Sequence, residues 1–260
     1  MAVAAASLIN ENQKKQYLDQ GYFVLENVIP AEHLEMLRDE CSRFIDRSNC
    51  EMDAAGTDVL GLNHRNSRYF IHDCYRLSDR LGEFIFSEVM ADICRATLGG
   101  EAYLFWNQYV VKCAEVGMKF SWHQDSGYVG HDHRPYLTCW CPLDDVTIEN
   151  GTVYVLSYDR AGTRSRVEHI RDKGSNDLVG YHGDDPGEPV IAPAGSIAVF
   201  SSTTFHRSGP NTTNQMRRVF LAQYSAEPIM TADGSRLWGE AEPFLENGSI
   251  VYTGKSGCQT

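Results

Sequence analysis

The spacing of apolar residues divides the chain into a helical first part and a β-rich second part. After Pro30, apolar side chains recur at helical spacing, and a second run of this kind extends from about Ser78 to Gly99. Each run predicts a helix that buries one stripe against a sheet. A shorter helix is predicted before them, because Asn10 and Gln13 have the pattern of a capping box.

From residue 102 onward the pattern changes to the alternation that is typical of strands. Residues 102–113 are aromatic and β-branched and give the strongest strand prediction. Further strands are predicted at 22–28, 119–124, 136–142, 152–157, 189–191, 196–200, 204–207 and 217–224. This order predicts a mainly β fold with flanking helices, whose core is a double-stranded β-helix, the jelly-roll form of the cupins.

The length and composition favour one domain. With 260 residues and 42% hydrophobic content, the chain can bury one sizeable core, so we expect a single domain over residues 1–260. Within it, residues 1–100 are predicted to form a helical flank with the first strand. Residues 101–226 are predicted to form the jelly-roll core, and residues 227–260 are predicted to form a C-terminal extension.

The charge and the cysteines limit the partners and the compartment. A net charge of −12 argues against nucleic acid, because binding a phosphate backbone requires a basic face. No apolar run reaches the length needed to cross a bilayer, and residues 1–9 lack the basic start of a signal peptide. The eight cysteines are dispersed, so we expect reduced thiols in a cytoplasmic protein that does not bind membranes.

Three residues form a candidate metal site. His123 and Asp125 are two positions apart, and in an extended segment both side chains would lie on one face. His206 would supply a third ligand from a distant strand. Two histidines and one carboxylate that leave the opposite positions open are diagnostic of non-haem Fe(II) oxygenases.

Arg217 is a candidate ligand for a second cofactor. It lies eleven residues after His206, at the start of an alternating run that predicts a strand, so its side chain can point into the same interior. A buried guanidinium needs an anion, and its fork matches a carboxylate. The distal carboxylate of 2-oxoglutarate, whose other end would chelate the iron, meets this requirement.

With these residues in place, the sequence resembles the phytanoyl-CoA dioxygenase family of Fe(II)- and 2-oxoglutarate-dependent oxygenases. The resemblance covers most of the chain. It rests on Gly21–Ile29, which resembles the opening strand of the family, on Trp122–Asp125, on Glu149–Thr152, and on the block that contains His206 and Arg217.

The resemblance also implies roles for single residues. The iron ligands would be His123, Asp125 and His206. Arg217 and Ser208 would hold the far carboxylate of 2-oxoglutarate, and Trp140 and Asn107 match positions that contact this cofactor.

The implied activity is hydroxylation of an unactivated C–H bond in a small-molecule substrate with O2, which releases succinate and CO2. One alternative is a cupin-type dioxygenase or isomerase that uses no 2-oxoglutarate, and another is a protein that binds metal or 2-oxoglutarate without turnover. Where the family usually has Pro-Gly-Ser-His, this chain has Leu156–Asp159, on the side towards the substrate. The sequence therefore leaves the substrate open, and it does not predict an oligomeric state.

Three segments without a strand pattern are predicted to surround the site. Residues 48–70 are expected to be a long irregular connection near its mouth, and residues 126–135 are expected to line its entrance. Residues 160–187 have the composition of a mobile lid. His131 and His133, although two positions apart, are expected to be solvated and not to bind a metal.

Overall fold

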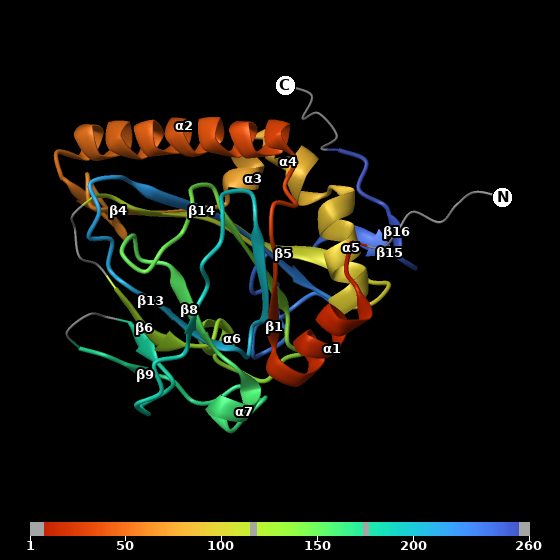
Figure 1. Cartoon of the computed structure of the whole chain (residues 1–260). Helices are drawn as coiled ribbons and strands as arrows, with labels where there is room; N and C mark the ends of the chain where they lie inside the picture. Colours follow the sequence, from red (N-terminus) through yellow and green to blue (C-terminus); the bar gives the residue numbers. More distant parts are fainter. Residues whose placement is uncertain (1–7, 115–118, 174–176, 255–260) are drawn as a thin grey trace.

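Two antiparallel β-sheets form the body of the protein in this computed structural model, which describes residues 8–114, 119–173 and 177–254 (Figure 1). Residues 1–9 were part of the predictions above, and the first seven of them lie outside the described residues. The fold is mainly β with flanking helices and has the antiparallel jelly-roll arrangement that the sequence predicts.

The larger sheet carries ten strands in the described part of the chain. Its main path runs through β1 (Tyr22–Leu25), β12 (Ile197–Ser201), β7 (Leu137–Pro142), β14 (Arg217–Ser225), β5 (Ala102–Lys112), β4 (Arg68–His72), β3 (Asn63–His64) and β2 (Val59–Leu60). In addition, β15 (Glu242–Glu246) pairs with β5, and β16 (Ser249–Ile250) pairs with β15.

The smaller sheet has four strands and faces the larger one. It consists of β11 (Glu188–Pro189), β8 (Val153–Leu156), β13 (Phe205–Ser208) and β6 (Phe120–His123). A separate pair is formed by β9 (Ile170–Arg171) and β10 (Leu178–Val179). Eight of the nine predicted strands are confirmed, although β1 ends three residues earlier than predicted. The ninth, predicted at 189–191, overlaps β11 only at Pro189.

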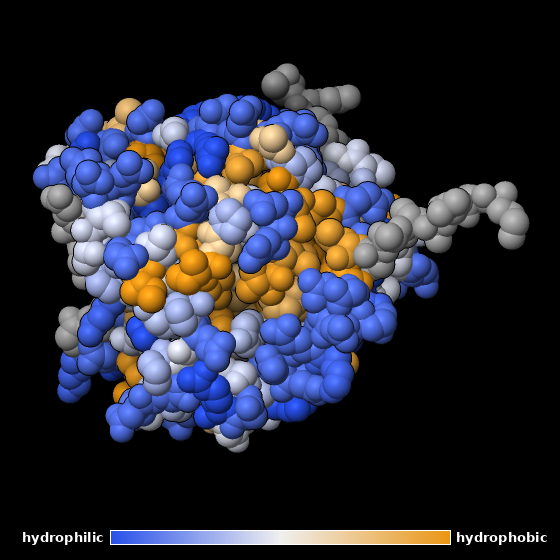
Figure 2. Space-filling model, viewed as in Figure 1, coloured by the Kyte–Doolittle hydropathy of each residue, from blue (hydrophilic) through white to orange (hydrophobic). Residues whose placement is uncertain are grey.

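Helices cover the outer face of the larger sheet. They are α1 (Glu11–Gln20), α2 (Ala31–Ala55), α3 (Cys74–Leu77), α4 (Asp79–Ile85) and α5 (Glu88–Thr97), and two short helices, α6 (Ser126–Val129) and α7 (Tyr158–Ala161), lie in loops. The long helix α2 contacts β4 and β14 through a buried stripe that includes Leu37, Cys41 and Phe44. Its outer face is hydrophilic, as the upper part of Figure 2 shows. The amphipathic pattern of this helix thus accounts for its position.

The prediction of an irregular connection over residues 48–70 is wrong. Helix α2 continues to Ala55, because Ser48 and Met52 extend its buried stripe by two turns. The chain then forms β2, β3 and β4, and β4 pairs with β5 along its whole length. The segment nevertheless reaches the mouth of the cavity described below, through Leu62, Phe70 and His72.

The proposed subdivision at residues 100 and 226 stays a prediction. One observation bears on its last part, because β15 lies in the C-terminal extension and pairs with β5 of the core. This extension therefore packs on the β-sheet that carries the candidate site.

Candidate functional site

A cavity of about 290 Å³ lies between the two sheets. The larger sheet contributes side chains of β4, β5, β7 and β14, and the smaller sheet contributes side chains of β6, β8 and β13. His123, Asp125 and His206 line this cavity together with Ser208, Arg217 and Trp140. Six of the seven predicted site residues therefore meet in one place.

The three candidate metal ligands lie at a distance that one ion can bridge. His123 on β6 and His206 on β13 are direct cross-strand partners. Oδ1 of Asp125 is 3.9 Å from Nε2 of His123 and 3.5 Å from Nε2 of His206. All three ligand atoms lie within 4.8 Å of one another, and no other such group occurs in the described part of the chain. The set has the composition of the site that binds non-haem iron.

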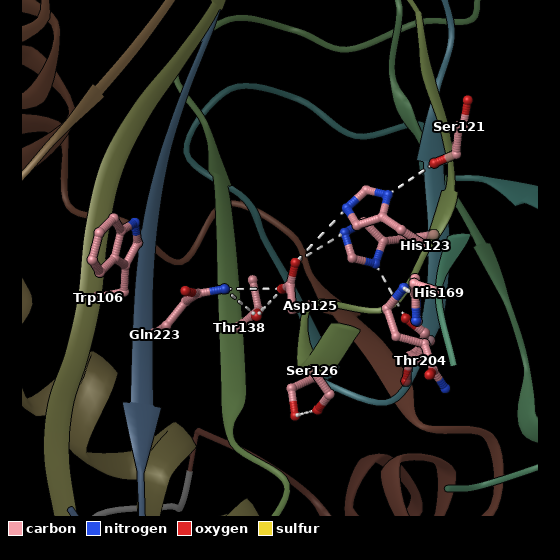
Figure 3. Close-up of polar contacts among 12 residues, drawn as sticks. Trp106, Ser121, His123, Asp125, Ser126, Thr138, His169, Thr204 and Gln223 are labelled. Carbon is pink, nitrogen blue, oxygen red and sulfur yellow. Dashed lines mark hydrogen bonds and ion pairs between the residues drawn. The ribbon is translucent and has the colours of Figure 1, made fainter. Parts of the chain in front are cut away.

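Hydrogen bonds orient both imidazole rings towards a metal. Nδ1 of His123 is 2.8 Å from the Ser121 carbonyl oxygen (Figure 3). Nδ1 of His206 is 3.1 Å from the Thr204 carbonyl oxygen. A carbonyl can only accept, so Nδ1 carries the proton and Nε2 keeps its lone pair. Burial, and then the neighbouring His206, lower the pKa of His123, which keeps it in the neutral form that metals bind.

Asp125 reaches the site in a different way from the one predicted. Strand β6 ends at His123, and Asp125 has helical backbone angles at the start of α6, so the two residues are not on one extended face. Its Oδ2 accepts hydrogen bonds from Thr138 (2.7 Å) and from Nε2 of Gln223 (2.9 Å). Figure 3 shows these two residues reaching Asp125 from the larger sheet. They fix the carboxylate and leave Oδ1 to face the histidines.

Gln124, between the two ligands, points away from the cavity. It is fully buried, and its amide nitrogen donates to the carbonyl oxygens of Thr203 (2.6 Å) and Ser165 (2.9 Å). Its amide oxygen accepts from the backbone of Val167. These bonds attach part of residues 160–187 to the turn that carries Asp125. None of the described residues of this segment lines the cavity, so its position does not support the prediction of a lid.

Arg217 provides an anion site at one end of the cavity. Its side chain is buried, and Nη2 donates to the Gly151 carbonyl oxygen at 2.8 Å. Nε and Nη1 are buried without a hydrogen-bond partner, although buried polar groups are normally satisfied. Burial lowers the pKa of Arg217 to about 10, so the group is still charged at neutral pH. Two free donors on a buried cation fit the carboxylate of 2-oxoglutarate.

Two residues beside Arg217 complete this end. The guanidinium carbon of Arg217 is 5.7 Å from the ring centre of Trp140, which lines the cavity as predicted. Ser208 also lines the cavity, and its hydroxyl accepts a hydrogen bond of 2.8 Å from Nζ of Lys112.

Lys112 was missed by sequence reasoning. It is buried and pairs directly with Arg217 across β5 and β14. Burial, and then the charge of Arg217, lower the pKa of Lys112 to about 6. The alternation of β5 could have revealed Lys112, because it lies two and four residues after Val110 and Gln108, which line the cavity, and so faces the same side of the strand.

The prediction for Asn107 is not supported. Its neighbours Trp106 and Gln108 line the cavity, so the alternation of β5 turns Asn107 to the opposite face. There its side-chain oxygen accepts a hydrogen bond of 2.9 Å from the backbone of Tyr75, which fixes α3. Asn107 therefore holds a helix in place and faces away from the cavity.

Residues 126–135 reach the entrance through one side chain. Tyr128 lines the cavity and is 43% exposed, so this segment borders the opening as predicted. His131 and His133 are half-buried instead of fully solvated, because each hydrogen-bonds within the loop or to its neighbours. Neither residue belongs to a metal-binding group in the described chain.

The fold and the site together define a class of protein, the non-haem iron oxygenases that use 2-oxoglutarate. The sequence supports this class independently, since residues 17–219 match the family model of phytanoyl-CoA dioxygenase (PhyH). The chain belongs to this family, and its cofactors are iron and 2-oxoglutarate.

Individual relatives have different substrates. The probable alpha-ketoglutarate-dependent hypophosphite dioxygenase of Stutzerimonas stutzeri is 24% identical over 259 residues, which cover 92% of this chain and 87% of that protein. EctD from S. alaskensis, solved with 2-oxoglutarate and 5-hydroxyectoine, has a TM-score of 0.66 and 20% identity, with 93% and 87% of the two chains covered.

A third relative extends this range. The epimerase SnoN, solved with Fe3+, alpha ketoglutarate and nogalamycin RO, has a TM-score of 0.60 and 19% identity, with 92% and 96% covered. These structures share the fold with this chain. Finally, no helix in the described residues is long and apolar enough to cross a membrane.

Proposed function

We propose that this protein hydroxylates an unactivated C–H bond of a small-molecule substrate, with consumption of 2-oxoglutarate and O2 and release of succinate and CO2. His123, Asp125 and His206 bind Fe(II) in this proposal. Arg217 and Ser208 hold the distal carboxylate of 2-oxoglutarate. One oxygen atom of O2 enters the substrate and the other enters succinate, so the reaction is balanced without a further reductant.

The observation that carries the proposal is the pair of unpartnered nitrogens on buried Arg217. Leaving a buried donor unsatisfied costs about 1–3 kcal/mol, and more for a charged group. Such a cost is offset when a ligand supplies the missing acceptors. Lys112, held on Ser208, adds a second basic group on the same side. A cupin that uses no 2-oxoglutarate has no need for either group.

The protein residues prepare the site for the iron, which supplies the activation of O2 when it is bound. The bonds to Ser121 and Thr204 keep Nε2 of each histidine free. The bonds from Thr138 and Gln223 hold the Asp125 carboxylate in a fixed orientation. Ligands fixed in this way lose little freedom when the metal binds. The apolar walls between the sheets exclude water from the reacting centre.

The test is succinate formation from 2-oxoglutarate by the Fe(II)-loaded protein after exposure to O2. We expect turnover in the wild type and its loss in His123→Ala. His182→Ala is the matched control, because His182 is exposed and lies outside the cavity. Absence of succinate from an iron-loaded protein, across a broad panel of substrates, would favour the reading in which the protein binds its cofactors without turnover.

A further inference from the structure

The end of the cavity opposite Arg217 is built from aromatic side chains. We call Phe105, Trp106, Tyr136 and Trp238 the aromatic wall. All four line the cavity, and Trp106 and Trp238 are partly exposed. The ring of Phe105 is 4.5 Å from that of Tyr136 and 5.6 Å from that of Trp238, and the two indole rings are 6.2 Å apart, measured between centres.

A bulge explains why two neighbouring residues of one strand belong to this wall. The register between β5 and β14 shifts between Gln223 and Tyr224, which pair with Trp106 and Leu104. Phe105 is the extra residue of this bulge, and a bulge redirects side chains locally. Both Phe105 and Trp106 therefore face the cavity, whereas strict alternation would turn one of them away.

The strand register separates the aromatic wall from the cofactor end. Arg217 pairs with Lys112, and Gln223 pairs with Trp106. Six residues of a strand span about 20 Å, at about 3.3 Å per residue. Gln223 also bonds Asp125. The aromatic wall therefore lies beside the candidate metal ligands, and the carboxylate site lies at the far end.

The aromatic end offers no free charge to a ligand. Among the described residues that line the cavity, Asp125 is the only carboxylate, and Arg207 and Arg217 are the only guanidinium groups. Nη2 of Arg207 donates to the Pro186 carbonyl oxygen at 2.9 Å, and its guanidinium carbon is 3.9 Å from the ring centre of Tyr154. His72, at the rim, is 2.7 Å from Asp73.

The polar groups near the wall are neutral. They are the indole nitrogens, the amide of Gln108, and the hydroxyls of Tyr128 and Tyr136. Burial raises the pKa of both tyrosines, so they stay protonated at neutral pH. A carboxylate here would be desolvated without a basic partner, which is strongly unfavourable. An ammonium group would find only ring faces, whose attraction of about 0.5–2 kcal/mol is smaller than the cost of removing its hydration. A carbonyl, hydroxyl or ether oxygen would find donors.

We infer that the substrate is an uncharged molecule with a ring system, which stacks on the aromatic wall and presents one C–H bond to His123, Asp125 and His206. This inference rests on the proposed function, because it assigns the cofactor to the other end of the same cavity. The cavity is near the lower limit of about 300 Å³ for small-molecule sites, and 2-oxoglutarate shares it. A portion of one or two rings therefore fits within the walls.

The test uses three probes that share one ring system and differ in charge. They are naphthalene-2-carboxamide, naphthalene-2-carboxylate and 2-naphthylmethylammonium, and their binding is measured by calorimetry on the Fe(II)- and 2-oxoglutarate-loaded protein without O2. We expect the carboxamide to bind at least about tenfold more tightly than both charged probes, since tenfold corresponds to only about 1.4 kcal/mol. Equal affinities, or no binding of any probe, would overturn the inference.

Variants locate the bound ring. Trp238→Ala is expected to weaken carboxamide binding about tenfold, whereas Trp238→Phe keeps a ring and restores most of the affinity. Leu237→Ala is the matched control, because Leu237 is exposed, adjacent in sequence and outside the cavity. If Trp238→Ala bound the carboxamide like Leu237→Ala, the wall would not be the binding surface.

A titration with 2-oxoglutarate separates this inference from the proposed function. If the titration shows no binding of 2-oxoglutarate, the probes are measured on the Fe(II)-loaded protein alone. Selective binding of the carboxamide in that case would refute the proposed function and would support the ligand class. Normal 2-oxoglutarate binding with no preference among the probes would have the opposite meaning, since it would refute the ligand class alone.

Discussion

Replacing Arg217 by methionine tests the assignment of the carboxylate site most directly. Methionine fills much of the same space but carries no charge and no donor. The substitution removes the two buried nitrogens that have no partner and the hydrogen bond from Nη2 to Gly151. Its effects on stability and on cofactor binding are therefore expected to have opposite signs.

The magnitude of each effect follows from these contacts. In the free protein, two unsatisfied donors cost about 1–3 kcal/mol each, and removing Arg217 leaves one unsatisfied carbonyl at a similar cost. The free energy of unfolding is therefore expected to rise by about 1–3 kcal/mol. Each charge-assisted bond to 2-oxoglutarate contributes about 1.5–3 kcal/mol, so losing two of them weakens binding at least about 100-fold.

Arg218→Met is the matched control for this experiment. Arg218 is the next residue on β14, and its guanidinium bonds both oxygens of Asp144, at 2.6 and 3.0 Å. Its loss is expected to lower the stability and to leave 2-oxoglutarate affinity unchanged. Urea unfolding of the free protein and calorimetric titration with 2-oxoglutarate measure the two quantities. An Arg217→Met protein that is clearly destabilised but binds 2-oxoglutarate normally would show that Arg217 has only a structural role.

Three further predictions concern other parts of the molecule. Burial and the charge of Arg217 lower the pKa of Lys112 to about 6, so above that pH a carboxylate that binds beside Lys112 causes this amine to take up a proton. The affinity for 2-oxoglutarate should therefore fall as the pH rises above 6, and calorimetry should show this dependence reduced in Lys112→Met. Thr138→Val removes a hydrogen bond of 2.7 Å to Asp125, so a chelator competition should show iron binding weakened about tenfold or more. An unchanged affinity for iron would contradict the role of that bond. Gly21→Ala should lower the free energy of unfolding, measured by urea titration, by several kcal/mol, because φ is +87° and the new Cβ would lie 2.5 Å from Thr204. Gly56→Ala is the control and should lower it by only about 1–2 kcal/mol, since φ there is +65° and nothing lies within 4 Å of the new Cβ.

The parts of the fold that were predicted correctly are those in which local and long-range requirements agree. The alternation of residues 102–113 and 217–224 reflects strands with one face on a core and the other on the cavity, and both were found as β5 and β14. The same alternation places Arg217 inside. Residues 48–70 were misread because β2 to β4 are short and partly exposed, so their sequence has no period to detect.

The site was predicted by residue type more accurately than by backbone geometry. His123, Asp125 and His206 converge as expected, but Asp125 does so from a helical turn because Gln124 is drawn to the other side. Asn107 was assigned by resemblance, and the alternation of β5 turns it away from the cavity. Trp238 could not be found at all, since only the folded chain brings the C-terminal extension to the cavity.

The arrangement of the two ends of the cavity explains how one site can combine a fixed cofactor with a variable substrate. Both ends lie on β5 and β14, but in rows of residues that are about 20 Å apart along the strands. Substitutions at this distance, without shared partners, usually have additive effects. Changes in the aromatic wall can therefore alter substrate binding without changing the contacts that we propose between Arg217 and 2-oxoglutarate. The two ends also differ in chemistry, since charge is concentrated at the carboxylate site and neutral rings surround the reacting centre. A charged substrate would require a new ionic partner in the wall, and a single substitution at Gln108, which lines the cavity between the two ends, could supply one.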